Sequence, residues 1–172
     1  MRYFHFLVLA LGFVAAEDGS LAWLRYAPVP SNKNINVVPS SILVLNSSTN
    51  SPVYTAGQEL RKGIKGIFGK HLDINETTEA PSSIIVGTAD AYQRRYGGLR
   101  EIDGLQEDGF FLSTEGSNVL IIGQNECGVL YGAFDYLSRV AQDKLTPVSF
   151  VSNPHALIRW WVFWPATQPL KN

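Results

Sequence analysis

The sequence predicts a single α/β domain, an α/β sandwich built on a mixed sheet. Three observations carry this prediction: short aliphatic runs that suit buried strands, helical segments with one apolar stripe, and one hairpin. The hairpin requires antiparallel neighbours, whereas the helical connections permit parallel ones. With 172 residues, 45% hydrophobic and 17% charged, the chain has material for one ordinary core.

The first strand and helix are expected over residues 41–69. Residues 41–45 form a β-branched and aliphatic run that ends in polar residues. Ser51 can cap the helix, Pro52 suits its first position and Gly69 can end it. The glycines at 63, 66 and 69 are interpreted as a loosened helix end. The expected buried stripe is Val53, Ala56, Leu60, Ile64 and Ile67.

The middle of the chain predicts two more strands and a short helix. Residues 71–74 suit a strand, and residues 83–87 suit one buried on both faces, because they show no alternation. A helix over about 88–95 should close at Gly97 and Gly98. Residues 99–108 are interpreted as a polar surface connection.

A hairpin and a long helix complete the prediction. The hairpin pairs residues 109–113 with 118–123 across the turn 114–117. The helix spans about 126–141 with Asn125 as its cap, and no element is predicted after it. Its expected apolar face is Cys127, Leu130, Phe134, Leu137 and Ala141.

The first residues are typical of a secretory signal peptide. Arg2, the apolar stretch 6–15 and the small residues up to Ala16 predict residues 1–16 as the signal, cleaved after Ala16. No apolar run is long enough to span a membrane, so a secreted, extracellular protein is expected. Sequons at Asn46 and Asn75 are then possible glycosylation sites. Cys127 is the single cysteine, which rules out an intramolecular disulfide.

The residues predict no catalytic group, no cofactor and no metal. A formal net charge of −1 with scattered basic residues argues against nucleic acid as a partner. His71 and His155 lack other ligands at metal spacing, and Cys127 is interpreted as a core residue rather than a nucleophile. Asp103, Glu107 and Asp108 could be paired catalytic carboxylates, but a solvated acidic loop is the favoured interpretation.

Several short motifs follow one another between about residues 18 and 160. They are Asp18-Gly19, Ala22-Trp23-Leu24-Arg25-Tyr26, Glu59-Leu60, Ile85-Val86-Gly87-Thr88, Glu107-Asp108-Gly109-Phe110-Phe111-Leu112, Val119-Leu120-Ile121-Ile122-Gly123-Gln124-Asn125, Gly128-Val129-Leu130-Tyr131-Gly132-Ala133-Phe134, Asn153-Pro154 and Arg159-Trp160. Together they resemble the small domain that precedes the catalytic barrel in hexosaminidases and, more specifically, in fungal xylan-degrading alpha-glucuronidases.

The resemblance implies an enzyme that releases glucuronic acid, often 4-O-methylated, from xylo-oligosaccharides, with inversion and without a metal. The family places its acid and base in the barrel, which needs at least about 200 further residues. The expectation is therefore a non-catalytic accessory domain, residues 17–160, whose partner is the catalytic barrel. Residues 161–172 depart from the family pattern and are expected to be an atypical tail that adds nothing to the fold.

Two other interpretations remain open. In a stand-alone carbohydrate-binding module, Trp160, Trp161 and Trp164 would stack on sugar rings. In a small enzyme of another class, Asp103 and Asp108 would carry the chemistry.

Overall fold

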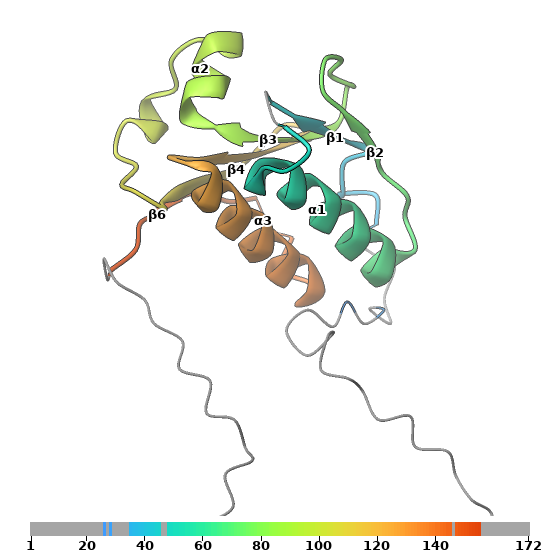
Figure 1. The fold of residues 1–172 in the computed structure, drawn as a ribbon. Helices are drawn as coiled ribbons and strands as arrows, with labels where there is room; N and C mark the ends of the chain where they lie inside the picture. Colours follow the sequence, from blue (N-terminus) through green and yellow to red (C-terminus); the bar gives the residue numbers. More distant parts are fainter. Residues whose placement is uncertain (1–25, 27, 29–34, 46–47, 146, 156–172) are drawn as a thin grey trace, which may run out of the picture.

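The protein is an α/β sandwich around one six-stranded mixed sheet (Figure 1). The computed structural model describes residues 26, 28, 35–45, 48–145 and 147–155, without the side chain of Glu115. The strand order is β2-β1-β3-β5-β4-β6. Strands β2 (Asp73–Asn75), β1 (Ser41–Val44), β3 (Ser83–Thr88) and β5 (Asn118–Gly123) are parallel, whereas β4 (Phe110–Glu115) runs antiparallel to β5 and to β6 (Ser149–Ser152). The predicted mixed sheet is confirmed.

Helices α1 (Pro52–Phe68) and α3 (Glu126–Ala141) cover one face of the sheet. Helix α2 (Ala89–Tyr96) and the 3₁₀ helix η2 (Arg100–Ile102) cover the other (Figure 1). Strand residues alternate between two cores, as the pleat requires. The α1/α3 core includes Ile42, Val44, Ile84, Val86, Leu112 and Ile121, and the α2/η2 core includes Leu43, Leu45, Ile85, Phe111, Leu120 and Ile122.

The helix caps follow the sequence closely. The Ser51 hydroxyl accepts a hydrogen bond from the Tyr54 amide at the start of α1, and Gly69 ends that helix. Asn125 caps α3, and Thr88 caps α2. The predicted buried stripe of α1 is confirmed, because all five of its members are buried. Side chains that satisfy first-turn amides therefore set these boundaries.

Three expectations about the chain path need correction. Strand β2 lies two residues later than predicted at its start and joins only β1, so it is an edge strand. The connection 99–108 is not wholly surface, because Ile102 and Leu105 are buried against the sheet. Strand β6 is an additional element that extends the sheet beyond β4. Its short polar and apolar alternation gives a weak signal without knowledge of the β4 edge.

Among the described residues, no helix is long and apolar enough to cross a membrane. The predicted signal peptide, the sequon at Asn46 and the atypical tail lie outside the described residues.

Candidate functional site

The acidic loop before β4 holds the carboxylates that the sequence singled out. Asp103 and Glu107 are exposed, whereas Asp108 is half-buried and has a positive φ of 61°. Oδ1 of Asp108 accepts a hydrogen bond of 2.9 Å from Nδ2 of Asn125. Asp108 is thus tied to the start of α3, a contact that fixes the loop against the helix. The solvated interpretation fits Asp103 and Glu107, whereas Asp108 is only partly exposed.

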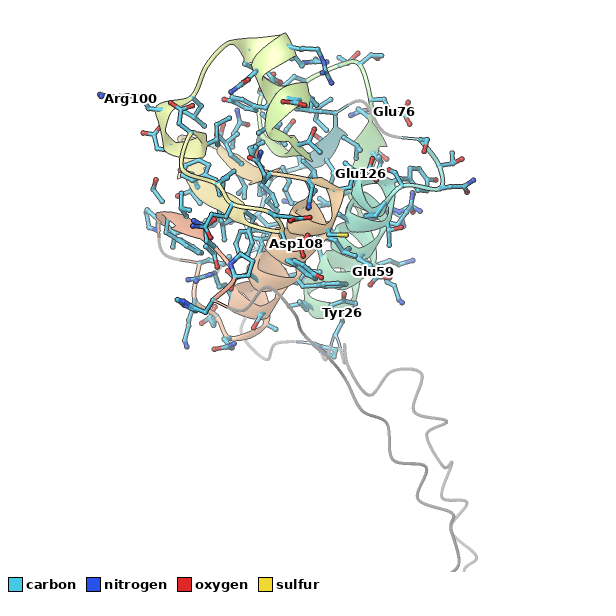
Figure 2. All side chains as sticks on the ribbon, turned by 60° about the vertical axis from the view of Figure 1, so that its left-hand side comes forward. Tyr26, Glu59, Glu76, Arg100, Asp108 and Glu126 are labelled. Carbon is cyan, nitrogen blue, oxygen red and sulfur yellow. The ribbon has the colours of Figure 1, made fainter. Side chains whose placement is uncertain are left out.

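Asn125 joins this loop to the helix with both ends of its amide. While Nδ2 donates to Asp108, Oδ1 accepts a 2.8 Å hydrogen bond from the Gly128 amide. The Gln124 amide donates to the Gly109 carbonyl at 2.9 Å. Figure 2 shows Asp108 beside the first turn of α3, where Glu126 is labelled. One side chain therefore ties the end of the acidic loop to the start of the helix.

Three glycines allow the backbones of the acidic loop, the end of β5 and the start of α3 to pack closely. A Cβ on Gly128 would collide with the Gly109 carbonyl, and a Cβ on Gly123 would collide with the Val129 amide. A Cβ on Gly109 would collide with the side chain of Asn153, just after β6. We name this cluster the glycine junction: Asp108, Gly109, Gly123, Asn125, Gly128 and Asn153. These residues come from the motifs that carry the family resemblance, and here they make close backbone packing.

Asn153 is the member of the junction that sequence reasoning missed as a structural residue. Its Oδ1 accepts from the Gln106 amide at 2.9 Å, and its Nδ2 donates to the Gly104 carbonyl at 3.1 Å. The only signal was its place in the Asn153-Pro154 motif. It secures the acidic loop to the end of β6.

Cys127 is exposed, so its interpretation as a core residue is wrong. His71 and His155 are also exposed, and no group of three metal-ligating side chains occurs within the described part of the chain.

The predicted apolar face of α3 is rotated from the face that the sheet buries. Of the five residues expected there, only Leu137 is fully buried, while Leu130 and Phe134 are half-buried and Cys127 and Ala141 are exposed. The helix can turn this face to the sheet because small residues lie there. Gly132, for example, lies against Ile121 and Phe110. Helix α3 thus has two apolar stripes. The buried one is Gly128, Val129, Gly132, Ala133, Tyr136, Leu137 and Val140.

Helices α1 and α3 pack closely through glycine, and Tyr26 sits on the outside of this contact. A Cβ on Gly63 would lie 2.6 Å from Leu137 and 2.9 Å from the Tyr26 ring. The Tyr26 hydroxyl donates to Oε2 of Glu59 at 3.0 Å (Figure 2). Burial, with that hydrogen bond, raises the pKa of Tyr26. The glycines of α1 are therefore contact residues inside a continuous helix, and the predicted loosened end is wrong.

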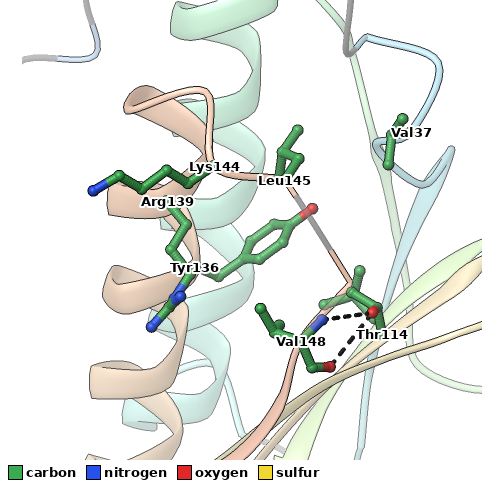
Figure 3. A pocket seen from close by; sticks show the side chains of 8 residues that line it. Val37, Thr114, Tyr136, Arg139, Lys144, Leu145 and Val148 are labelled. Atoms are coloured by element: carbon green, nitrogen blue, oxygen red, sulfur yellow. Dashed lines mark hydrogen bonds between the residues drawn. The ribbon is translucent and has the colours of Figure 1, made fainter.

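A small pocket lies at the other end of α3 (Figure 3). Its volume is about 20 Å³, enough for one water molecule, and its walls are mostly apolar. The Tyr136 hydroxyl points into it, toward Leu145 and Val37 (Figure 3). Tyr136 is 3% exposed, and burial raises its pKa. Within the described residues its hydroxyl has no hydrogen-bond partner.

A more open depression lies between α2 and the carboxyl ends of β1 and β2, with a volume of about 340 Å³. Leu45, Glu76, Ala91, Arg94 and Arg95 line it. Arg95 donates to the Thr77 carbonyl at 2.8 Å, and its guanidinium carbon lies 5.6 Å from the centroid of the Tyr96 ring. That arginine is therefore held by the protein itself.

Of the two predicted glycosylation sites, Asn75 lies within the described residues. It is the last residue of the edge strand β2 and is half-buried. The following residues, Glu76 and Thr77, are exposed. A glycan at Asn75 remains a prediction.

The fold is a small α/β domain in which four of the family motifs meet at the glycine junction. Residues 22–136 match the family described as "Glycosyl hydrolase family 67 N-terminus", well over half of the chain. The chain therefore belongs to the glycosyl hydrolase family 67 N-terminal domains.

Similar curated proteins include alpha-glucuronidases. Alpha-glucuronidase A of Emericella nidulans is 48% identical over 173 residues, which cover 98% of this chain and 20% of that protein. The alpha-glucuronidase of Hypocrea jecorina is 46% identical over 165 residues, covering 92% of this chain and 20% of that protein. The chain spans about a fifth of the length of these relatives.

Similar solved structures are also glycoside hydrolases. A 4-O-methyl-alpha-glucuronidase of family 115 aligns with a TM-score of 0.47 and 19% identity, covering 60% of this chain and 14% of that one. A Streptomyces plicatus beta-hexosaminidase aligns with a TM-score of 0.38 and 14% identity, covering 63% and 22%.

Proposed function

We propose that this chain serves as the N-terminal accessory domain of a secreted alpha-glucuronidase that removes glucuronic acid, often 4-O-methylated, from xylo-oligosaccharides. The observation that carries the proposal is the family 67 N-terminal match over residues 22–136, together with relatives that are themselves alpha-glucuronidases. In this role the domain packs on the catalytic part of the polypeptide and contributes no catalytic residue.

The engagement of Asp108 supports a non-catalytic role. A general acid or base must present its carboxyl group to a substrate within hydrogen-bond reach. Oδ1 of Asp108 instead accepts from Asn125 at the glycine junction. Its contact is explained by the architecture of the domain.

The test is an activity assay on the purified chain. Aldouronic xylo-oligosaccharides are incubated with the protein at high concentration, and released glucuronic acid is followed by product chromatography. We expect none. Turnover that survives purification and disappears in Asp103→Asn or Asp108→Asn would overturn the proposal in favour of a small enzyme, and an unaltered melting transition in those variants would exclude simple unfolding.

Secretion and glycosylation belong to the same proposal. We expect secreted material to begin at Glu17, after cleavage behind Ala16, and to carry glycans at Asn46 and Asn75 where the host makes them. N-terminal sequencing and glycosidase treatment would test this. An intact Met1 on a cytosolic protein would remove both claims.

A further inference from the structure

Helix α3 has a second apolar stripe that the fold does not fully cover. It consists of Cys127, Leu130, Tyr131 and Phe134, and we name it the outer α3 stripe. Cys127 is exposed and Tyr131 is 39% exposed, whereas Leu130 and Phe134 are half-buried because they also pack against the α1/α3 core. The run 127–134 has no charged residue. A helix that is apolar on two sides is typical of one covered on two sides.

Polar groups border this stripe on both sides. On α1, Glu59 accepts from Tyr26 and lies 3.6 Å from the Lys62 amine. On the far flank of α3, Arg139 pairs with Asp135 at 2.6 Å. An apolar centre with a charged rim is the usual anatomy of a protein interface.

The residue that follows β6, Asn153, lies close to the start of the outer α3 stripe. Asn153 follows β6 and contacts Gly109, which in turn contacts Gly128 in the first turn of α3. Gly128 is next to Cys127 and one turn before Tyr131. The chain corresponds to one fifth of its relatives and to the N-terminus of their family, so most of a relative's polypeptide follows the segment that matches this chain.

We propose that the outer α3 stripe is the surface on which the catalytic part of the alpha-glucuronidase polypeptide packs. This inference rests on the proposed function and adds the face of the domain that makes the contact. The apolar area between the charged rims supplies the binding energy, and the covalent connection raises the effective concentration of the partner.

Cys127 provides a direct probe, because it is the single cysteine of the chain and lies on the stripe. A chimera is made from the Emericella nidulans relative, with residues 17–160 of this chain replacing its matching segment. The rate at which a thiol reagent modifies Cys127 is then compared between the 172-residue chain and the chimera. The same chimera with Cys127→Ser measures the reaction of the relative's own cysteines, and this background rate is subtracted.

We expect Cys127 to react at least about tenfold more slowly in the chimera, since modification requires an accessible thiolate. The matched control carries Cys127→Ser with Glu101→Cys, because Glu101 is exposed on η2, over the other face of the sheet. Its thiol should react equally in both proteins.

A pair of equally exposed tyrosines gives a second measurement. Tyr131 and Tyr96 are both 39% exposed, but Tyr96 lies on α2. Tyr131→Lys should lower the Tm of the chimera by several degrees more than that of the isolated chain. Tyr96→Lys should change both proteins equally.

The outcomes separate the two proposals. If the chimera is active but Cys127 stays reactive and Tyr131→Lys has no extra effect, the docking face is wrong and the proposed function stands. If the chimera neither folds nor cleaves while the relative does, the proposed function fails and this inference with it. If Cys127 is already protected in the isolated chain and becomes reactive on dilution, a second copy covers the stripe and the inference is overturned.

Discussion

The two ends of α3 are packed in opposite ways. At its start, the glycine junction brings backbone against backbone, and Asn125 uses both ends of its amide. Toward its end, Tyr136 directs a hydroxyl into a pocket of about 20 Å³. Four of the motifs that resemble the family meet at the tight end, whereas Tyr26 and Glu59 belong to motifs at the α1/α3 contact. Recognisable residues in this domain therefore mark close packing, which a search for catalytic groups alone would misread.

The largest loss of stability is expected from one methyl group added at the glycine junction. Gly128→Ala should lower the free energy of unfolding by about 3 kcal/mol, because its Cβ would collide with the Gly109 carbonyl and backbone cannot easily move aside. Urea denaturation measures the change. Gly98→Ala is the matched control: a Cβ there meets nothing within 4 Å, so its effect should stay within about 0.5 kcal/mol. Equal losses in the two variants would contradict the junction.

A smaller loss of stability is expected when the side-chain amide of Asn125, which links the acidic loop to α3, is removed. Asn125→Ala should cost about 1–2 kcal/mol, since it removes the cap of α3 and leaves Asp108 without this donor. Asn125→Ser keeps a cap oxygen but cannot reach Asp108, so its melting temperature should fall between those of the parent and Asn125→Ala. If the serine variant matched the parent, the contact with Asp108 would contribute nothing to stability.

The local signals in the sequence predicted much of this fold. Ser51, Pro52 and Asn125 placed the starts of α1 and α3, because capping depends on residues within one turn. The predicted buried face of α3 was wrong because the run 127–134 is apolar around the helix, and tertiary contacts such as that of Gly132 with Ile121 select the buried side. Strand β6 was missed for a similar reason, since its pairing with β4 is a long-range contact.

The candidate site was less accessible to sequence reasoning than the fold. Asp108 could be singled out as a carboxylate, but its contact with Asn125 joins residues 17 apart in the chain. Tyr26 and Glu59 are 33 residues apart, and each belonged to a separate motif. A single sequence lists such residues without their distances. Their roles follow only once the junction and the α1/α3 contact are formed.

Two tyrosine hydroxyls, one on the half-buried Tyr26 and one on the buried Tyr136, give the smallest expected effect. The Tyr26 hydroxyl donates to Glu59 at 3.0 Å, so Tyr26→Phe should lower the free energy of unfolding by about 1 kcal/mol. The Tyr136 hydroxyl has no protein partner among the described residues, and removing it leaves the apolar ring in place. Tyr136→Phe should therefore change stability by less than about 0.5 kcal/mol or raise it slightly, because an unpaired buried hydroxyl is itself unfavourable. Thermal unfolding of the two variants side by side provides the measurement. A loss in Tyr136→Phe as large as in Tyr26→Phe would mean that the pocket holds a well-bound water, and that the loose end of α3 is as well satisfied as its start.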